Sequence, residues 1–359
     1  LDITGQLGLA WRGMSETKPT TPDRKKSVTS YDVARLAGVS QSAVSRCYKP
    51  GASVSQKTRA KVEKAAKALG YQPNALARSL ITSRSNSVAV IISNLTNLYY
   101  PEVLAQLSKH FSQGGIRVLL FALESESEAD SALSQIWQYQ VDGVVCAAKL
   151  TKQQISEFSD RGIPLLFYNR QSGSHAASAV CCDQADGSQT LCEGLLRAGH
   201  RSFALLKGPE DSVVGTEREA SARATLAAAG ITEIKELDGD FSYEGARDAI
   251  RRLMAAGLAL PDAIICVNDV SAIGAIDTLR NEFGAAIPDE VSVVGFDGVG
   301  PASWSSFDLT TIRQPVRRMT KAAVDMILER VETPDLANEK RVFAGIFTRG
   351  NSARINMDN

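Results

Sequence analysis

From residue 87 onward, short apolar runs alternate with longer amphipathic stretches, and this rhythm constrains the fold more than any other feature. The runs are VAVIIS (88–93), RVLLFAL (117–123), GVVCAA (143–148), PLLFYN (164–169), FALLKG (203–208), AIICVND (263–269) and VSVVGF (291–296). Most are separated by about 20–35 residues with a helical pattern, which is the spacing of βαβ units. We therefore expect parallel sheets flanked by helices, with more strands than one small sheet holds.

The segment YDVARLAGVSQSAVSRCYKP (31–50) contains two short amphipathic patterns separated by Gly38. The apolar residues in each pattern are three and four positions apart, so each predicted helix has one buried face. Thr29 or Ser30 can cap the first helix and Ser40 the second, whereas Gly38 favours the left-handed backbone that ends a helix. The segment therefore predicts a helix-turn-helix.

A third helix is expected over QKTRAKVEKAAKAL (56–69), with Ser55 as its N-cap and Gly70 at its end. The surrounding region is strongly basic, because residues 24–84 hold thirteen Lys or Arg and two acidic residues in a chain with 40 of each. A small basic three-helix unit is typical of proteins that place one helix in the major groove of DNA.

At 359 residues the chain is long enough for two or three domains. No apolar run approaches the roughly 18 residues of a membrane helix, and the opening residues lack the pattern of a secretory signal. The chain begins with Leu1, whereas Met14 heads a more typical start. Residues 1–13 are therefore candidates for non-native sequence, and we expect the whole segment 1–26 to be a disordered tail.

The sequence offers little support for an enzyme, a metal site or a resident cofactor. Its six cysteines include no C-x-x-C pair and its three histidines are not clustered, which favours buried free thiols in a reducing cytoplasm. The nucleotide-binding patterns G-x-G-x-x-G and G-x-x-x-x-G-K-[ST] and the nucleophile elbow G-x-S-x-G are absent. We therefore predict a protein that binds rather than catalyses.

Two sets of segments resemble the lactose-repressor (LacI) family of bacterial transcription regulators. YDVARLAGVS and VSQKTRAKVEKAAKALGYQPNALARSL, within 28–80, are similar to its DNA-binding headpiece. Its larger domain is matched by DGVV (142–145), LRAGHRSFALLKGP (196–209), NDVSAIGAIDTL (268–279), IPDEVSVVGFDG (287–298) and LTTIRQP (309–315).

The resemblance spans about residues 28–350. It implies an all-α helix-turn-helix headpiece followed by an α/β domain with two lobes, like a periplasmic binding protein. The expected divisions are a DNA-binding domain (27–71), a hinge helix and linker (72–86), a two-lobed effector-binding and dimerisation domain (87–352) and a C-terminal tail (353–359).

The same resemblance assigns DNA contacts in the headpiece. It places Gln41, Ser42 and Arg46 at base edges, and Gln and Arg can read adenine and guanine through paired hydrogen bonds. It places Tyr31, Ser45, Tyr71 and Asn74 near phosphates, although the rings of Tyr31 and Tyr71 can also complete the small core. In the hinge, Leu80 would wedge into the minor groove with Ala77 beside it, the alternative being a plain linker.

Two departures from the family pattern bear on the operator sequence. Ala43 stands where the family usually has Thr, so one hydroxyl contact is lost. Cys47, Tyr48 and Lys49 replace the usual apolar pair and Asn, so the operator can differ from the common one.

An effector cleft is also implied by the resemblance, with residues near the carboxyl ends of the strands. These are Tyr99, Tyr100, Asn169, Arg218, Phe241, Asn268 and Asp297. Simpler roles stay open: Asn268 with Asp269 can cap a helix, one of the two tyrosines can be a core residue, and Asn169 can belong to a surface turn. Arg218 is followed by EASA (219–222) rather than the family's Gly-aromatic pair, so the cleft shape can differ.

Together these features predict a homodimeric, cytoplasmic regulator that represses transcription from a palindromic double-stranded operator. A small polar effector, a sugar or related metabolite, would bind between the lobes and control the affinity for DNA. Two alternatives stay open. One is a soluble sugar receptor with a vestigial headpiece, and the other is an architectural DNA binder with an inactive cleft, which would bind without sequence preference.

Overall fold

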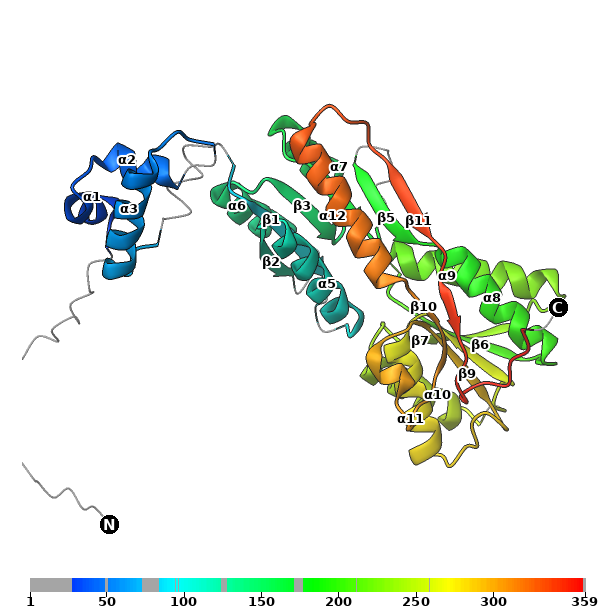
Figure 1. Cartoon of the computed structure of the whole chain (residues 1–359). Helices are drawn as coiled ribbons and strands as arrows, with labels where there is room; N and C mark the ends of the chain where they lie inside the picture. The colour runs from blue at the N-terminus through cyan, green and yellow to red at the C-terminus, as the bar shows by residue number, and fades with distance from the viewer. Residues whose placement is uncertain are drawn as a thin grey trace, which may run out of the picture. The chain divides into compact units, whose positions relative to one another are not determined.

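The computed structural model describes residues 28–48, 51–72, 84–93, 95, 97–123, 128–170, 177–210, 212–257 and 259–357. The chain divides into two compact units, 1–78 and 79–359, and this division falls inside the predicted hinge and linker segment (Figure 1). The predicted tail 1–26 and the hinge residues Asn74, Ala77 and Leu80 lie outside the described residues.

The described residues of the first unit form the helices α1 (Ser30–Ala37), α2 (Gln41–Cys47) and α3 (Gln56–Leu69). The carboxylate of Asp32 accepts hydrogen bonds from the Thr29 amide at 3.0 Å and hydroxyl at 2.7 Å, which anchors the start of α1. The Ser40 side chain caps α2 and the Ser55 side chain caps α3. Gly38 ends α1 with a φ of 66°, so the predicted helix-turn-helix is confirmed.

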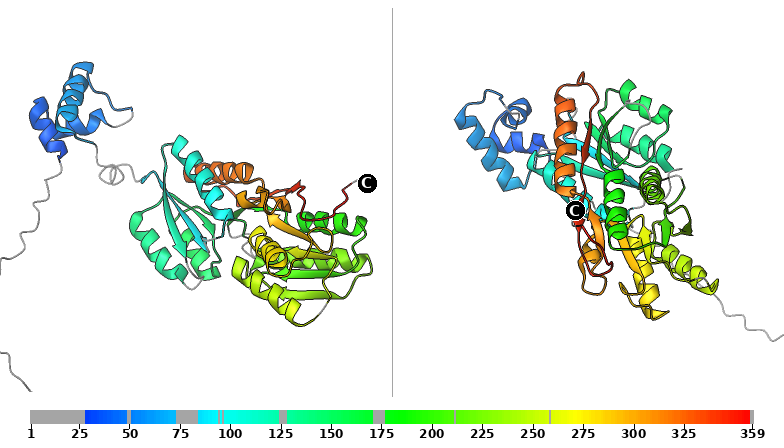
Figure 2. Two further views of the ribbon diagram at one scale, coloured as in Figure 1. Left: turned by 90° about the horizontal axis from the view of Figure 1, so that it is seen from below. Right: turned by 90° about the vertical axis from the view of Figure 1, so that its right-hand side faces the viewer.

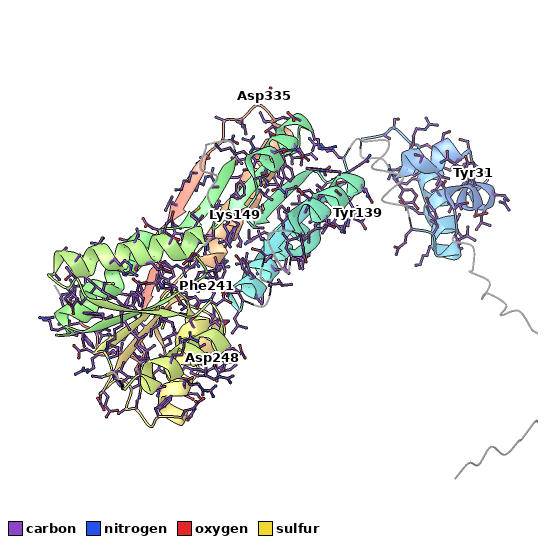
Figure 3. All side chains as sticks on the ribbon, turned by 180° about the vertical axis from the view of Figure 1, so that it is seen from behind. Tyr31, Tyr139, Lys149, Phe241, Asp248 and Asp335 are labelled. Atoms are coloured by element: carbon purple, nitrogen blue, oxygen red, sulfur yellow. The ribbon has the colours of Figure 1, made fainter. Side chains whose placement is uncertain are left out.

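Apolar side chains from all three helices form a small core in this unit. Val33 of α1, Val44 of α2 and Val62 of α3 are fully buried. The Tyr71 ring packs against this core and lies 6.2 Å from the Tyr48 ring. Tyr31 is 68% exposed (Figure 3), so its ring does not complete the core.

The described residues of the second unit form two six-stranded sheets, one in each of two lobes (Figure 2). The first sheet is parallel throughout, in the order β11-β5-β4-β3-β1-β2, and the second has the order β12-β10-β9-β8-β6-β7 with only β12 antiparallel. The strands of the first sheet are β1 (Ser87–Ser93), β2 (Arg117–Leu123), β3 (Gly143–Ala147), β4 (Leu165–Tyr168), β5 (Ser178–Cys182) and β11 (Lys340–Phe343). Those of the second are β6 (Phe203–Lys207), β7 (Ile234–Asp238), β8 (Ala263–Cys266), β9 (Ser292–Asp297), β10 (Thr310–Arg313) and β12 (Ile346–Thr348).

Helices flank both sheets, as the alternation of apolar runs predicts. The first lobe holds α5 (Tyr99–Gln113), α6 (Ala129–Tyr139), α7 (Lys152–Asp160) and α12 (Val316–Glu332). The second holds α8 (Gln184–Arg197), α9 (Val213–Ala228), α10 (Tyr243–Ala255), α11 (Asp269–Asn281) and the short 3-10 helix η2 (Gly300–Ser303). The chain passes between the lobes after β5, after β10 and between β11 and β12. Each lobe is therefore built from separate segments of the chain.

The cysteines at positions 47, 146, 181, 182, 192 and 266 are buried, as predicted, and their thiols are free. Among the described residues, no helix has the length and apolar character needed to span a membrane. In the same ranges, no group of three or more His, Cys, Asp or Glu side chains is arranged to hold a metal ion.

Candidate functional site

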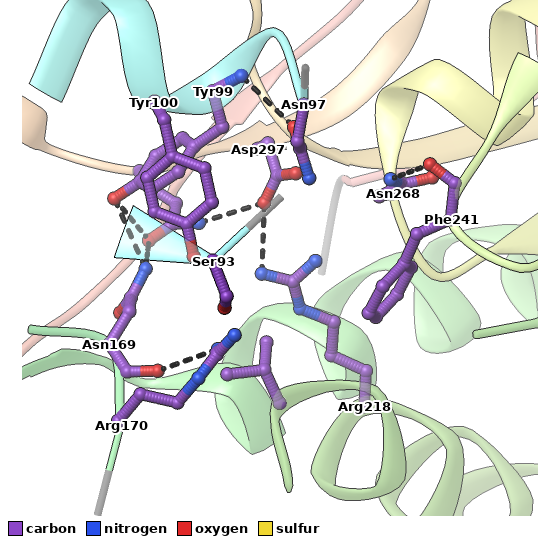
Figure 4. A pocket seen from close by; sticks show the side chains of 12 residues that line it. Ser93, Asn97, Tyr99, Tyr100, Asn169, Arg170, Arg218, Phe241, Asn268 and Asp297 are labelled. Atoms are coloured by element: carbon purple, nitrogen blue, oxygen red, sulfur yellow. Dashed lines mark hydrogen bonds and ion pairs between the residues drawn. The ribbon is translucent and has the colours of Figure 1, made fainter. Parts of the chain in front are cut away.

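A pocket between the two lobes brings together all seven residues predicted to line the effector cleft (Figure 4). It is lined by Ser93, Asn97, Tyr99, Tyr100, Asn169, Arg170, Val214, Arg218, Phe241, Asn268, Asp297 and Gln314. Ser93 and Asp297 end strands β1 and β9, and Asn169 follows β4 directly. The pocket therefore lies at the carboxyl ends of the strands, where open α/β sheets bind ligands.

Arg218 and Asp297 form a buried ion pair in this pocket. Their side chains are 4% and 5% exposed, and the Nη2–Oδ1 distance is 2.9 Å. Arg218 also donates from Nε to the Gln184 side chain at 2.8 Å and from Nη1 to the Val267 carbonyl at 2.5 Å, and it stacks on the Phe296 ring. Burial raises the pKa of Asp297, while the charge of Arg218 opposes that rise. The pair presents a donor and an acceptor in fixed positions.

Gln314 connects the two lobes at this pocket, and it is not among the residues predicted from the sequence. It lies between β10 and α12, and its Nε2 donates to Asp297 Oδ1 at 2.8 Å. Its Oε1 accepts from the Tyr99 hydroxyl at 3.0 Å and from Asn169 Nδ2 at 2.5 Å. The sequence feature that could have identified Gln314 is its position just after TTIR (310–313), within the segment LTTIRQP that resembles the family.

Both tyrosines belong to the core and to the pocket. Tyr99 and Tyr100 lie at the start of α5, are nearly fully buried, and have ring centroids 5.5 Å apart. Burial raises the pKa of the Tyr99 phenol well above its ordinary value, so the hydroxyl stays a neutral donor to Gln314. Each of these tyrosines is therefore both a core residue and a residue that lines the pocket.

The aromatic wall of the pocket depends on two glycines. Phe241 has a φ of 53°, and its ring packs against Gly208 after β6 and Gly215 in the first turn of α9. A Cβ atom at Gly208 would lie 2.5 Å from a ring carbon of Phe241, so only glycine leaves room for the ring. The ring can stack on a sugar or base face.

We predict that Gly208→Ala moves the Phe241 ring and lowers the free energy of unfolding by about 1–3 kcal/mol, the usual cost of overpacking. The comparison is Gly114→Ala, since a Cβ there would approach no heavy atom closer than 3.5 Å and φ is −86°. Urea denaturation of both variants tests this. Equal stability of the two would show that the ring has space to move.

Asn268 has the capping role that the sequence left open, and it also lines the pocket. Its Oδ1 accepts from the Ser271 amide at 2.9 Å, which caps α11, and its Nδ2 donates to the Phe241 carbonyl at 3.1 Å (Figure 4). Asn169 is buried rather than part of an exposed turn, since its Oδ1 accepts from the Cys182 amide at 3.0 Å.

In the first unit, α2 exposes a polar face opposite its buried residues Val44 and Cys47. Ser42 and Arg46 are exposed, one turn apart, whereas Gln41 and Ser45 are partly buried. The Gln41 side chain donates to Ser30 at 3.3 Å, so its amide is tied to α1. This exposed face has the size and chemistry of a recognition helix.

Both units match families of known proteins. Residues 29–74 match the family described as bacterial regulatory proteins, lacI family, and residues 85–344 match the periplasmic binding proteins and sugar binding domain of LacI family. The ribose operon repressor of Escherichia coli (strain K12) is 30% identical over 330 residues, which cover 90% of this chain and 99% of that protein. The transcriptional repressor PurR of Vibrio parahaemolyticus is 32% identical over 321 residues, which cover 88% and 95%.

Two solved structures show the same architecture. The lac repressor dimer bound to operator and the anti-inducer ONPF has a TM-score of 0.81 at 28% identity, and the match covers 91% of this chain and 99% of that one. The regulator CelR in complex with cellobiose has a TM-score of 0.68 at 27% identity, with 91% and 100% covered. This chain therefore belongs to the lacI family of bacterial regulatory proteins and is a DNA-binding transcriptional regulator with an effector-binding domain.

Proposed function

We propose that the protein is a homodimeric repressor that binds a palindromic operator. A small polar effector controls its affinity for that operator. The observation that carries this proposal is the pocket between the lobes, where an ion pair, amide groups and an aromatic ring converge. An effector that binds there contacts both lobes, so it can bias the angle between them. The similarity to the ribose operon repressor and to CelR, whose structure is a complex with cellobiose, favours a sugar as the effector.

The proposed DNA contacts divide by chemistry. Arg46, Ser42 and Gln41 would read base edges, and Tyr31, Ser45 and Tyr71 would contact phosphates. By resemblance Asn74 joins the phosphate contacts, and Ala77 and Leu80 act in the minor groove. The described part of this unit holds seven Lys or Arg and two acidic residues, which supports a polyanionic partner.

We further propose that the protein is not an enzyme and has no resident cofactor. Its relatives are transcriptional repressors. In the described part of the pocket the polar groups form hydrogen bonds with one another, an arrangement suited to binding a ligand. A chromosomal regulator of this kind acts in the cytoplasm, in association with the nucleoid.

Selection of genomic fragments by the purified full chain, followed by sequencing, tests the proposal. We expect enrichment of a palindrome of about 14–20 base pairs, the span of two half-sites. The selection is repeated with D-ribose and then with small-molecule cell extract. Absence of enrichment under every condition would contradict the repressor and favour the soluble receptor with a vestigial headpiece.

We predict that Arg46→Ala weakens binding to the selected operator by about 1–3 kcal/mol and relaxes the base preference at one position of each half-site. Arg35→Ala is the matched control, since Arg35 is an exposed α1 residue paired with Asp32 at 3.0 Å. Fluorescence anisotropy with the operator and with single-base variants measures both effects. Loss of affinity without relaxed preference would place Arg46 at a phosphate instead.

A further inference from the structure

Two segments that face the pocket have a backbone conformation that L-residues rarely adopt. Asp240 and Phe241 have φ values of 50° and 53°, and Asp297 has a φ of 122°, followed by Gly298 at 71°. Positive φ at residues other than glycine persists only where the surroundings hold it in place. Both segments belong to the second lobe, and both present a side chain to the pocket.

The start of α11 contacts the first of these segments through Asn268. This residue is 1% exposed, and its Nδ2 donates to the Phe241 carbonyl at 3.1 Å while its Oδ1 caps the helix. The single amide group thus joins the helix terminus to the aromatic wall of the pocket. Its hydrogen bond holds the Phe241 backbone in the position that seats the ring against Gly208 and Gly215.

The next residue, Asp269, contacts the second segment and lines no part of the pocket. It is 0% exposed, and its Oδ2 accepts from the Val299 amide at 2.8 Å. Its Oδ1 accepts from the Thr311 hydroxyl of β10 at 2.6 Å. These bonds hold the turn at 297–299, which directs the Asp297 carboxylate toward Arg218 and Gln314.

We propose that Asn268 and Asp269 are positioning residues that fix both ligand-facing segments of the second lobe, the Phe241 wall and the 297–299 turn, from one helix terminus. This inference rests on the proposed function, because it treats the pocket as the effector site. It assigns to Asp269 a role in effector recognition without contact with the effector. It also accounts for how two backbone conformations of low intrinsic stability are held beside one pocket.

Hydrogen exchange of the full chain, without ligand or DNA, tests the positioning roles separately. Asn268→Ser keeps an N-cap oxygen for α11 but removes the donor to Phe241, and we expect roughly tenfold faster exchange at 239–243. Asp269→Ala should give a similar increase at 298–299, where the amides lose their acceptor. Asp269→Asn should restore most of that protection, because its carbonyl can still accept from Val299 while its amide faces the Thr311 oxygen.

Matched controls lie away from the pocket. Asn281→Ala changes the same residue type at the other end of α11, and Asp325→Asn changes an exposed acid of α12 that pairs with Lys321. Unchanged exchange at 239–243 in Asn268→Ser, or at 298–299 in Asp269→Ala, would overturn the corresponding role. A uniform increase over β8 and β9 would also overturn it, because that result describes general destabilisation of the lobe.

Two further assays on the same proteins, operator binding and D-ribose binding, test the proposed function. The control substitutions Asn281→Ala and Asp325→Asn lie outside the pocket and outside α1, α2 and α3, so operator affinity in these two variants should match that of the unmodified chain within about twofold. Binding of D-ribose, by calorimetry, tests the sugar class. Loss of local protection with no binding of operator or D-ribose would support the positioning roles while contradicting the proposed function.

Discussion

Replacing Asp297 with Ala should lower the free energy of unfolding by about 3–5 kcal/mol and abolish the response to the effector, while the headpiece keeps its fold. The stability loss follows from burial: Arg218 is 4% exposed, and the substitution removes its only carboxylate partner among the described ion pairs. Gln314 Nε2 also loses its acceptor. An unpaired buried charge costs more than the original pair contributes. Chemical denaturation of the full chain measures the change.

The double variant Arg218→Met with Asp297→Ala provides the control. Because it removes both charges, we expect it to be more stable than Asp297→Ala alone by several kcal/mol, about 2–4. Operator affinity without effector should persist in Asp297→Ala, since residues 1–78 form a separate compact unit. If Asp297→Ala lost less than about 1 kcal/mol, Arg218 would have found solvent or another partner, and the pocket would be less rigid than described.

The difference in free energy of unfolding between the unmodified protein and the Asp269→Asn variant should depend strongly on pH. Burial, and next the nearby charge of Asp297, raise the pKa of Asp269 from 3.8 to about 7. Asp297 of β9 and the buried thiol of Cys266 on β8 are the titratable groups coupled to it, and Arg218 of α9 is the cation paired with Asp297. In the unfolded chain the carboxyl loses its proton near pH 4, whereas in the folded chain it keeps the proton until about pH 7.

The direction of this pH dependence follows from the pKa of Asp269 in the unfolded and folded chain. The folded state holds the extra proton between about pH 4 and 7, so stability falls as pH rises through that window and levels off above it. Relative to Asp269→Asn, which cannot ionise, the unmodified protein should lose about 3 kcal/mol between pH 5 and pH 8. Urea denaturation at several pH values measures this, with Asp325→Asn as the exposed control. Parallel curves for all three proteins would show that Asp269 is ionised throughout the range.

Local chemistry determined much of the first unit. The helix caps depend only on neighbouring residues, so their positions predicted α2, α3 and the helix ends. The N-caps are Ser40 and Ser55, and the left-handed residues that end α1 and α3 are Gly38 and Gly70. The same holds for β1, β3, β4, β6, β8 and β9, whose apolar runs stand out because both faces are covered. Strands β5, β7, β10, β11 and β12 were not recognised. Half-exposed edge strands such as IKELD and KRVF do not form apolar runs, and the buried strands SAVCC and TTIR are short and contain Ser or Thr.

The pocket was predictable only in part. The resemblance identified seven lining residues that lie as much as 198 positions apart (99 to 297), and the structure brings them together. Gln314 and Asp269 were not identified as positioning groups, because their partners Tyr99, Asn169, Val299 and Thr311 become neighbours only after the lobes and strands have assembled. The positive φ at Phe241 likewise has no local signal, since a bulky aromatic residue rarely adopts it.

By itself, then, the sequence determined the helix-turn-helix, the alternating α/β architecture and the residue types available for recognition, because these depend on contacts within one element or its neighbours. Only the tertiary structure decided which polar groups pair with one another. A buried hydrogen bond is favourable only when both partners arrive in register, and that register is set by the crossings between lobes and the packing of α11 against β9.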